Sequence, residues 1–277
     1  VLYRKDYYGI IFPIFTKTIY MSLKRQVPNF ITILNLLCGA IATIFAVQGN
    51  LIMAALFVAL GIFFDFFDGL AARALDVKSE IGLQLDSLAD MITSGLVPGI
   101  VMYQLLVRAL PGAEKPVSNW ADSGSWWEWN FPTLALVGLL IAAASGYRLA
   151  KFNIDDRQTD SFIGLPTPAN ALLILSLPLI IAFQPHPWAV ELILNEWFLI
   201  GLTLVSCYML NAEIPLFALK FSDWSFKENK LRYFFIGFCL LMLIVFQFIA
   251  IPLIIISYVI VSIVFPGKKE DLKTSKS

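Results

Sequence analysis

Long apolar runs separated by short polar segments dominate the pattern along this chain. The hydrocarbon core of a bilayer is about 30 Å thick, so a helix needs roughly 20 mostly apolar residues to cross it. The pattern therefore predicts an all-α integral membrane protein with about eight transmembrane helices. The predicted spans are about 30–48, 51–70, 82–107, 132–150, 168–184, 195–212, 231–248 and 250–265.

The last two predicted spans are separated only by the region around Pro252. We predict a hairpin there, because the combined stretch is too long for a single crossing. The other six spans form a predicted core at 21–212, and 213–277 adds a loop, the two-helix extension and a short basic tail. Residues 1–20 mix aromatic and basic side chains, which predicts an N-terminal extension or an interfacial helix.

Basic residues are distributed unequally between the two predicted faces of the membrane. If the N-terminus lies in the cytoplasm and the spans alternate, all of the 20 lysines and arginines except Arg108 and Lys115 lie on the cytoplasmic side. Lysine and arginine are enriched in cytoplasmic loops. We therefore predict a protein of the cytoplasmic (inner) membrane with both termini in the cytoplasm.

The composition limits the chemistry that is available. The chain is 58% apolar and 14% charged, with a formal net charge of zero, which argues against a nucleic-acid partner. The three cysteines lie in apolar stretches without paired spacing, and His186 is the only histidine. Polar chemistry is therefore expected to depend on carboxylates.

Four aspartates interrupt the predicted spans, and their spacing is informative. Asp65 and Asp68 are three residues apart near the end of the second span, and Asp86 and Asp90 are four apart early in the third. Each pair shares one helix face, and the short connection between the helices brings both pairs to one depth. Oxygen ligands select Mg²⁺, Mn²⁺ or Ca²⁺, and two such ions suit phosphoryl transfer. Buried aspartates also occur in the proton or cation relays of transporters, which is the alternative interpretation.

The residues between the two pairs agree with a phosphate ligand. Gly69 permits close approach to the backbone, and Ala72 is small on the same side. Arg73 offers a planar, charged group for a phosphate. Gly82 leaves space at the start of the third span.

The spacing D-x-x-D-G-x-x-A-R, eight residues, then G-x-x-x-D-x-x-x-D resembles the signature of the CDP-alcohol phosphotransferase family, with all eight specified positions filled from Asp65 to Asp90. The resemblance implies a membrane transferase in which an alcohol attacks a CDP-linked lipid and CMP is released. It also implies a six-helix core, a homodimer, and an active site that faces the cytoplasm.

The same resemblance implies roles for individual residues. Asp65, Asp68 and Asp86 would be metal ligands, and Asp90 would be both a ligand and the general base that takes the proton of the attacking hydroxyl. Gly69, Ala72 and Gly82 would line the nucleotide pocket, and Arg73 would contact a phosphate group of the CDP-linked lipid, so that all four would bind the lipid donor.

Three further stretches resemble the phosphatidylserine synthases of that family, beginning at Pro28, Arg148 and Phe162. In the first, Thr32 and Asn35 are candidates for nucleotide contact, although capping and helix–helix hydrogen bonds explain them as well. In the second, Arg148, Lys151 and Asn153 are candidates for binding the serine carboxylate or the lipid phosphate. Topology and helix capping explain these two basic residues too. Lys151 stands where the subfamily more often has arginine.

The sequence thus predicts an enzyme that makes phosphatidylserine and CMP from CDP-diacylglycerol and L-serine, with membrane lipids around it. One alternative is a sibling enzyme whose acceptor is glycerol 3-phosphate or an inositol. A divalent-cation transporter is the alternative from another class, but it would need a polar path through both leaflets, and the four aspartates lie on one side.

Overall fold

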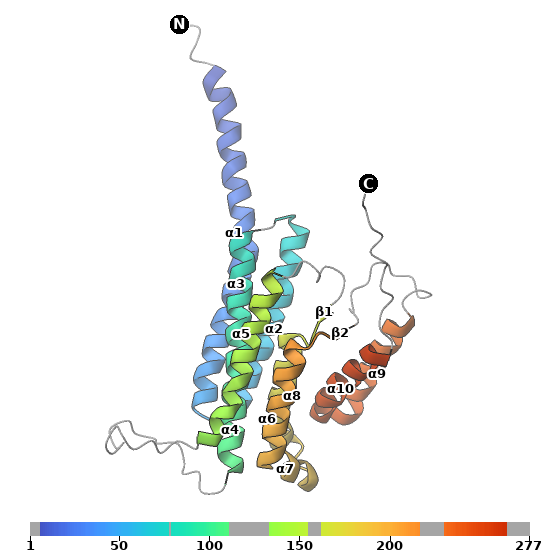
Figure 1. Ribbon diagram of the computed structural model, residues 1–277. Coiled ribbons are helices and arrows are strands. Elements are labelled where there is room, and N and C mark those ends of the chain that lie inside the picture. The colour runs from blue at the N-terminus through green and yellow to red at the C-terminus, as the bar shows by residue number, and fades with distance from the viewer. Residues whose placement is uncertain (1–5, 78, 111–132, 155–161, 217–229, 265–277) are drawn as a thin grey trace, which may run out of the picture.

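The computed structural model describes residues 6–77, 79–110, 133–154, 162–216 and 230–264, and these are almost entirely helical (Figure 1). The all-α prediction is confirmed. The α-helices are α1 Asp6–Val47, α2 Leu51–Ala74, α3 Glu80–Asp90, α4 Val97–Ala109, α5 Leu140–Ile154, α6 Thr167–Phe183, α7 Pro187–Ile193, α8 Glu196–Asn211, α9 Lys230–Phe246 and α10 Ala250–Val264.

The first helix is longer than the predicted first span. From Asp6 onward, the N-terminal segment continues into that span as one helix, α1, which projects beyond the rest of the bundle (Figure 1). A turn follows in which Gly49 has a φ of 77°, and Asn50 then caps α2 by accepting a hydrogen bond from the Met53 amide (3.2 Å). This short connection makes α1 and α2 antiparallel neighbours.

The predicted third span contains an unpredicted irregularity. A π-helix, Met91–Leu96, joins α3 to α4, so that the whole segment from Glu80 to Ala109 is one continuous helical rod. Inserted π turns occur frequently at functional sites. Here the π turn begins directly after Asp90.

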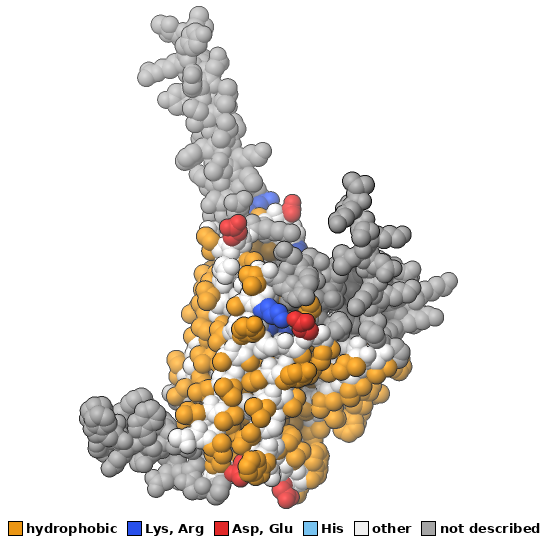
Figure 2. Space-filling model, viewed as in Figure 1, with side chains coloured by type: hydrophobic (Ala, Val, Ile, Leu, Met, Phe, Trp, Pro, Cys, Tyr) orange, Lys and Arg blue, Asp and Glu red, His pale blue; other side chains and the backbone are white. Residues whose placement is uncertain are grey.

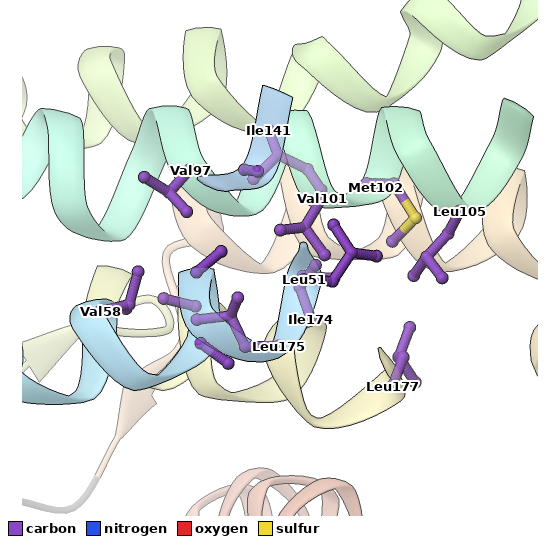
Figure 3. Close-up of a cluster of buried hydrophobic side chains, with 14 of the residues drawn as sticks. Leu51, Val58, Val97, Val101, Met102, Leu105, Ile141, Ile174, Leu175 and Leu177 are labelled. Atoms are coloured by element: carbon purple, nitrogen blue, oxygen red, sulfur yellow. The ribbon is translucent and has the colours of Figure 1, made fainter. Parts of the chain in front are cut away.

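Buried apolar side chains from several helices form the core (Figure 3). Fully buried side chains from α2, α4, α5 and α6 meet there, including Val58, Met102, Ile141 and Ile174. Small residues let α1 and α2 approach closely, as is usual for helices packed in a membrane. These are Ala42, Ala46, Ala54 and Ala55. The fully buried α2 residues of this core lie in the first half of the helix, and Asp65 and Asp68 lie in its second half.

Apolar side chains also cover the outside of the bundle (Figure 2). In the described part of the chain, five helical segments are long and apolar enough to cross a membrane, and α7 with α8, bent by 65°, would make a sixth. The prediction of eight spans counted α6, which at 17 residues is short for a crossing, and separated α9 from α10. The protein is an integral membrane protein, and eight crossings stay a prediction.

The C-terminal helices fold back on each other as predicted. The segment Tyr233–Val264 is long enough for one tilted span, but the rings of Phe235 and Tyr258 lie 6.1 Å apart, which a straight helix excludes. The reversal occurs at a 3₁₀ turn, Gln247–Ile249, where Gln247 has a φ of 48°. Pro252, where the sequence placed the break, instead lies in the first turn of α10, which tolerates proline.

A single short strand pair departs from the helical pattern in the described ranges. β1, Phe162–Ile163, pairs antiparallel with β2, Pro215–Leu216. Gly164 follows with a φ of 75°, and its amide donates to the Ile214 carbonyl (2.9 Å). The pair ties the segment before α6 to the segment after α8.

Candidate active site

Three of the four motif aspartates converge in the structure. Carboxylate oxygens of Asp65 and Asp68 on α2 and of Asp86 on α3 lie within 4.8 Å of one another. Asp68 is buried, and the hydroxyl of Thr32 on α1 donates to its Oδ2 (2.6 Å). The helix α1 packs against both α2 and α3, so it sets the distance between the two aspartate-bearing helices.

This donor set fits hard divalent cations. Such ions take oxygen ligands, mainly carboxylates, and three acidic groups this close together need a positive charge between them. The ion pair that the structure shows among its described residues, Lys151 with Glu213, lies elsewhere. The expected cluster of Asp65, Asp68 and Asp86 therefore forms and could hold a metal.

The fourth aspartate has a separate environment. Asp90 lies one helical turn beyond Asp86, at the last position of α3, and is not among the three carboxylates that converge within 4.8 Å. Its Oδ1 accepts a hydrogen bond from Nδ2 of Asn35 on α1 (3.4 Å). Its position next to the cluster suits a group that acts beside bound ions, and its roles as ligand and base stay predictions.

A cavity of about 440 Å³ opens beside the cluster, between α1, α2 and α3. Four of the sequence-predicted donor-binding residues line it: Thr32, Gly69, Ala72 and Gly82. No atom beyond its own helix lies within 4 Å of the place that a Cβ would take on Gly69, so this position is open to a ligand. The cavity also borders Asp68 and Asp86, which connects it to the carboxylates.

Two predicted donor-binding residues lie outside this lining. Nε of Arg73 donates to the Gly69 carbonyl (3.0 Å) on the exposed side of α2. Asn35 is completely buried, and its amide is used between Asp90 and Thr93. The structure therefore gives Asn35 the interhelical contact that the sequence left open as an alternative to nucleotide contact.

Sequence reasoning missed several lining residues, namely Val77, Ser79, Glu80 and Leu83. Asn29, which shares one face of the first span with Thr32, also borders the cavity, as does Pro28. The sequence carries a signal for Ser79, because serine is a preferred N-cap residue at the start of a helix. Ser79 caps α3 by accepting from the Gly82 amide (3.2 Å), which fixes the cavity edge. Thr93, discussed below, had no comparable signal.

The basic residues at the C-terminal end of α5 make contacts within the protein. Nη1 of Arg148 donates to the carbonyls of Ile163 (2.9 Å) and Leu210 (2.8 Å), so this buried arginine holds the strand pair against the end of α8. Lys151 pairs with Glu213 (3.3 Å) at the surface. The acceptor-binding role that the sequence suggested for these residues stays a prediction.

Asn153 links this basic end to the carboxylate-bearing helix. Its Nδ2 donates to the hydroxyl of Ser87 (3.0 Å), and that hydroxyl also lies 3.1 Å from Oδ1 of Asn153. Ser87 directly follows Asp86 in the chain. Asn153, one of the predicted acceptor residues on α5, therefore lies next to α3, the helix that carries the predicted metal ligand Asp86.

Comparison with known proteins adds a family. Residues 25–209 match the family model described as CDP-alcohol phosphatidyltransferase, the family whose signature the motif resembles. This range includes α2, α3 and the cavity, and it excludes the C-terminal hairpin of α9 and α10.

Similar proteins include three named CDP-diacylglycerol–serine O-phosphatidyltransferase. The one from Bacillus subtilis is 34% identical over 157 residues, which is 55% of this chain and 75% of the relative. The one from Helicobacter pylori (strain 26695) is 29% identical over 53% of this chain and 55% of the relative. The one from Methanocaldococcus jannaschii is 30% identical over 54% and 58%. The chain thus spans little more than half the length of the last two.

Proposed function

This chain belongs to the CDP-alcohol phosphatidyltransferase family, and from that premise we propose that it makes phosphatidylserine and CMP from CDP-diacylglycerol and L-serine. The observation that carries the proposal is the cavity between α1, α2 and α3, which borders Asp68 and Asp86, two of the three converging carboxylates. The serine acceptor is supported by the names of the relatives described above.

The cavity is the proposed site of the lipid donor. Its polar lining from Asn29, Thr32 and Ser79 offers hydrogen-bonding groups to the cytidine and the ribose, while Gly69 and Gly82 leave room for them. The acyl chains of the donor would remain among the lipids that surround the apolar outer surface of the helices. This arrangement brings the diphosphate next to Asp68 and Asp86, at the carboxylate edge of the cavity.

Asp65, Asp68 and Asp86, with Asp90 beside them, would hold the divalent cations Mg²⁺ or Mn²⁺, two in each site. When bound, such ions neutralise the diphosphate and stabilise the departing CMP. The protein itself supplies the rigid frame, because Thr32 fixes one carboxylate of this set through its 2.6 Å hydrogen bond to Asp68.

Asp90 is the proposed general base. The serine hydroxyl attacks the phosphorus that carries diacylglycerol, a new P–O bond forms, and the P–O bond to CMP breaks. The proton of the hydroxyl passes to the carboxylate of Asp90, because a neutral hydroxyl is a poor nucleophile. The hydrogen bond from Asn35 holds that carboxylate in place.

The acceptor is proposed to enter from the basic end of α5. Lys151 offers a positive charge to the serine carboxylate, and Asn153 offers an amide next to α3. Arg148 holds the neighbouring backbone in position. The excess of basic residues on one side further supports a site that faces the cytoplasm in the inner membrane, and we propose a homodimer by family resemblance.

The test is release of CMP by the purified full chain in detergent with CDP-diacylglycerol and Mg²⁺ or Mn²⁺. L-serine, glycerol 3-phosphate and myo-inositol are supplied in parallel. We expect CMP with serine alone and none after chelation of the metal. Release of CMP with another alcohol would show that this alcohol, and not serine, is the acceptor. If folded protein supplied with metal released no CMP with any of them, the proposed reaction would be overturned.

A matched pair of variants separates the site from general effects of charge. Asp86→Asn removes a converging carboxylate, whereas Asp76→Asn makes the same change at an exposed residue that occupies one of the unspecified positions of the motif. Asp76 has a φ of 51°, a conformation that asparagine tolerates. We expect CMP release and Mn²⁺ binding, followed by electron paramagnetic resonance, to be lost in the first variant and kept in the second.

A further inference from the structure

A buried chain of hydrogen bonds runs from the π-helix to Asp90 through a different helix. The hydroxyl of Thr93 donates to Oδ1 of Asn35 (2.8 Å), and Nδ2 of the same asparagine donates to Asp90 (3.4 Å). Thr93 and Asn35 are both completely buried. The three residues therefore form one connected unit between α1 and the rod formed by α3 and α4.

The surrounding helices leave room for this chain through two glycines. A Cβ on Gly61 of α2 would lie 2.6 Å from Cγ2 of Thr93 and 2.8 Å from Oδ1 of Asn35. A Cβ on Gly39 of α1 would collide with the Thr93 hydroxyl. Thr93 thus occupies a space that exists because both neighbours lack a side chain.

We propose that Thr93 is a positioning residue for the reaction, which fixes the orientation of the Asn35 amide and through it the carboxylate of Asp90. An asparagine side chain can turn over, exchanging its oxygen and nitrogen. If the amide turned, its oxygen would face the carboxylate and the attraction would become repulsion. The carboxylate of Asp90 therefore favours the orientation in which nitrogen faces it, and the Thr93 hydroxyl, by donating to the amide oxygen, anchors the amide in that orientation.

Thr93 acts on the reaction from outside the substrate cavity. It is not among the residues that line the 440 Å³ cavity, and within the described part of the chain the hydrogen bonds of its hydroxyl go to the side-chain oxygen of Asn35 and, at 3.3 Å, to the backbone oxygen of the same residue. A change at Thr93 is therefore expected to affect the rate of the chemical step and to leave binding of the lipid donor intact. This inference rests on the proposed role of Asp90 as general base.

The decisive comparison is Thr93→Ser against Thr93→Ala, because these two variants differ by one oxygen atom. Both lose the methyl group, so packing changes equally. We expect the serine variant to keep kcat near that of the wild type and the alanine variant to lose about tenfold, with the KM for CDP-diacylglycerol unchanged in both. A tenfold loss corresponds to about 1.4 kcal/mol in the barrier. Equal kcat values, or a loss that appears in KM alone, would overturn the proposal.

A double-mutant cycle tests whether Thr93 works through Asn35. If it does, Thr93→Ala has no further effect on kcat once Asn35→Ala has removed the amide, because coupled residues are not additive. Full additivity would overturn the proposal. Thr203→Ala is the control, since Thr203 is also completely buried but donates only to a carbonyl of its own helix (2.8 Å).

The outcome of this test is separable from that of the proposed function. Turnover of the wild type with each acceptor decides the reaction, and the ratio of the Thr93→Ser and Thr93→Ala rates is measured with whichever acceptor releases CMP. Thermal unfolding of each variant is followed in parallel. An alanine variant that unfolds at a lower temperature but turns over normally would assign Thr93 to packing alone.

Discussion

Two groups of buried or half-buried polar residues in this bundle differ in their hydrogen-bond partners. The guanidinium of Arg148 is held by two backbone carbonyls of the protein itself. Two of the three converging carboxylates, Asp68 and Asp86, instead border an open cavity, and the hydroxyl of Thr32 donates to Asp68. A buried polar group that the fold satisfies supports the fold, whereas groups that face a cavity are available for a ligand.

The largest effect is expected at Asp90, one helical turn beyond the converging carboxylate of Asp86. Asp90→Asn keeps the size of the side chain but removes the base, and general bases typically contribute about 10²–10⁴ in rate. We therefore expect kcat to fall by about that factor while binding of CDP-diacylglycerol and the unfolding temperature are kept. Steady-state kinetics and donor binding check this. Turnover like that of the wild type would remove Asp90 from the mechanism.

Arg148 is expected to show the opposite pattern. Arg148→Ala removes two hydrogen bonds from a charged donor and leaves the buried carbonyls of Ile163 and Leu210 without it. Each such bond is worth about 1.5–3 kcal/mol, so the unfolding temperature should fall clearly.

Arg148→Lys is the matched variant, because it keeps the charge but not the planar group. It should recover little of the stability if the guanidinium must reach both carbonyls. An unchanged unfolding temperature together with a raised KM for serine would break the comparison. It would return Arg148 to the acceptor site, as the sequence suggested.

A smaller effect is expected at Gly69. Alanine at this position meets no other part of the protein and should stabilise the helix α2 by up to about 1 kcal/mol. The added methyl group would nevertheless project toward the donor. We expect a KM for CDP-diacylglycerol raised about tenfold without loss of stability, measured by kinetics and thermal unfolding. An unchanged KM would show that the donor does not approach this part of the cavity.

The sequence predicts the carboxylate site well because the information there is local. Helix periodicity places Asp65 with Asp68 and Asp86 with Asp90, and a short connection brings the two helices together. The same logic explains three of the cavity-lining positions, Gly69, Ala72 and Gly82, since small residues near a charged motif indicate space for a ligand. The apolar runs likewise predict the helices, because each has to match the thickness of the bilayer.

What the sequence does not predict depends on contacts between distant residues. The π-helix Met91–Leu96, directly after Asp90, is not marked by the pattern of apolar and polar residues. The partner of Thr93 is Asn35, 58 residues away, and the carbonyls that hold Arg148 lie 15 and 62 residues away. Arginine at a helix end looks the same in sequence whether it binds a substrate or a backbone.

The smallest effect is expected at the exposed pair of Lys151 and Glu213, which separates a structural ion pair from an acceptor site. Exposed pairs contribute about 0–1 kcal/mol, so neither Lys151→Met nor Glu213→Gln should change the unfolding temperature much. If Lys151 receives the serine carboxylate, its variant raises the KM for serine severalfold. Glu213→Gln should leave that KM unchanged or lower it, because removing the acidic partner frees the ammonium group. If the two variants change the KM for serine equally at low and at high salt, Lys151 serves only in its surface ion pair with Glu213. Asn153 would then remain as the predicted acceptor contact on α5.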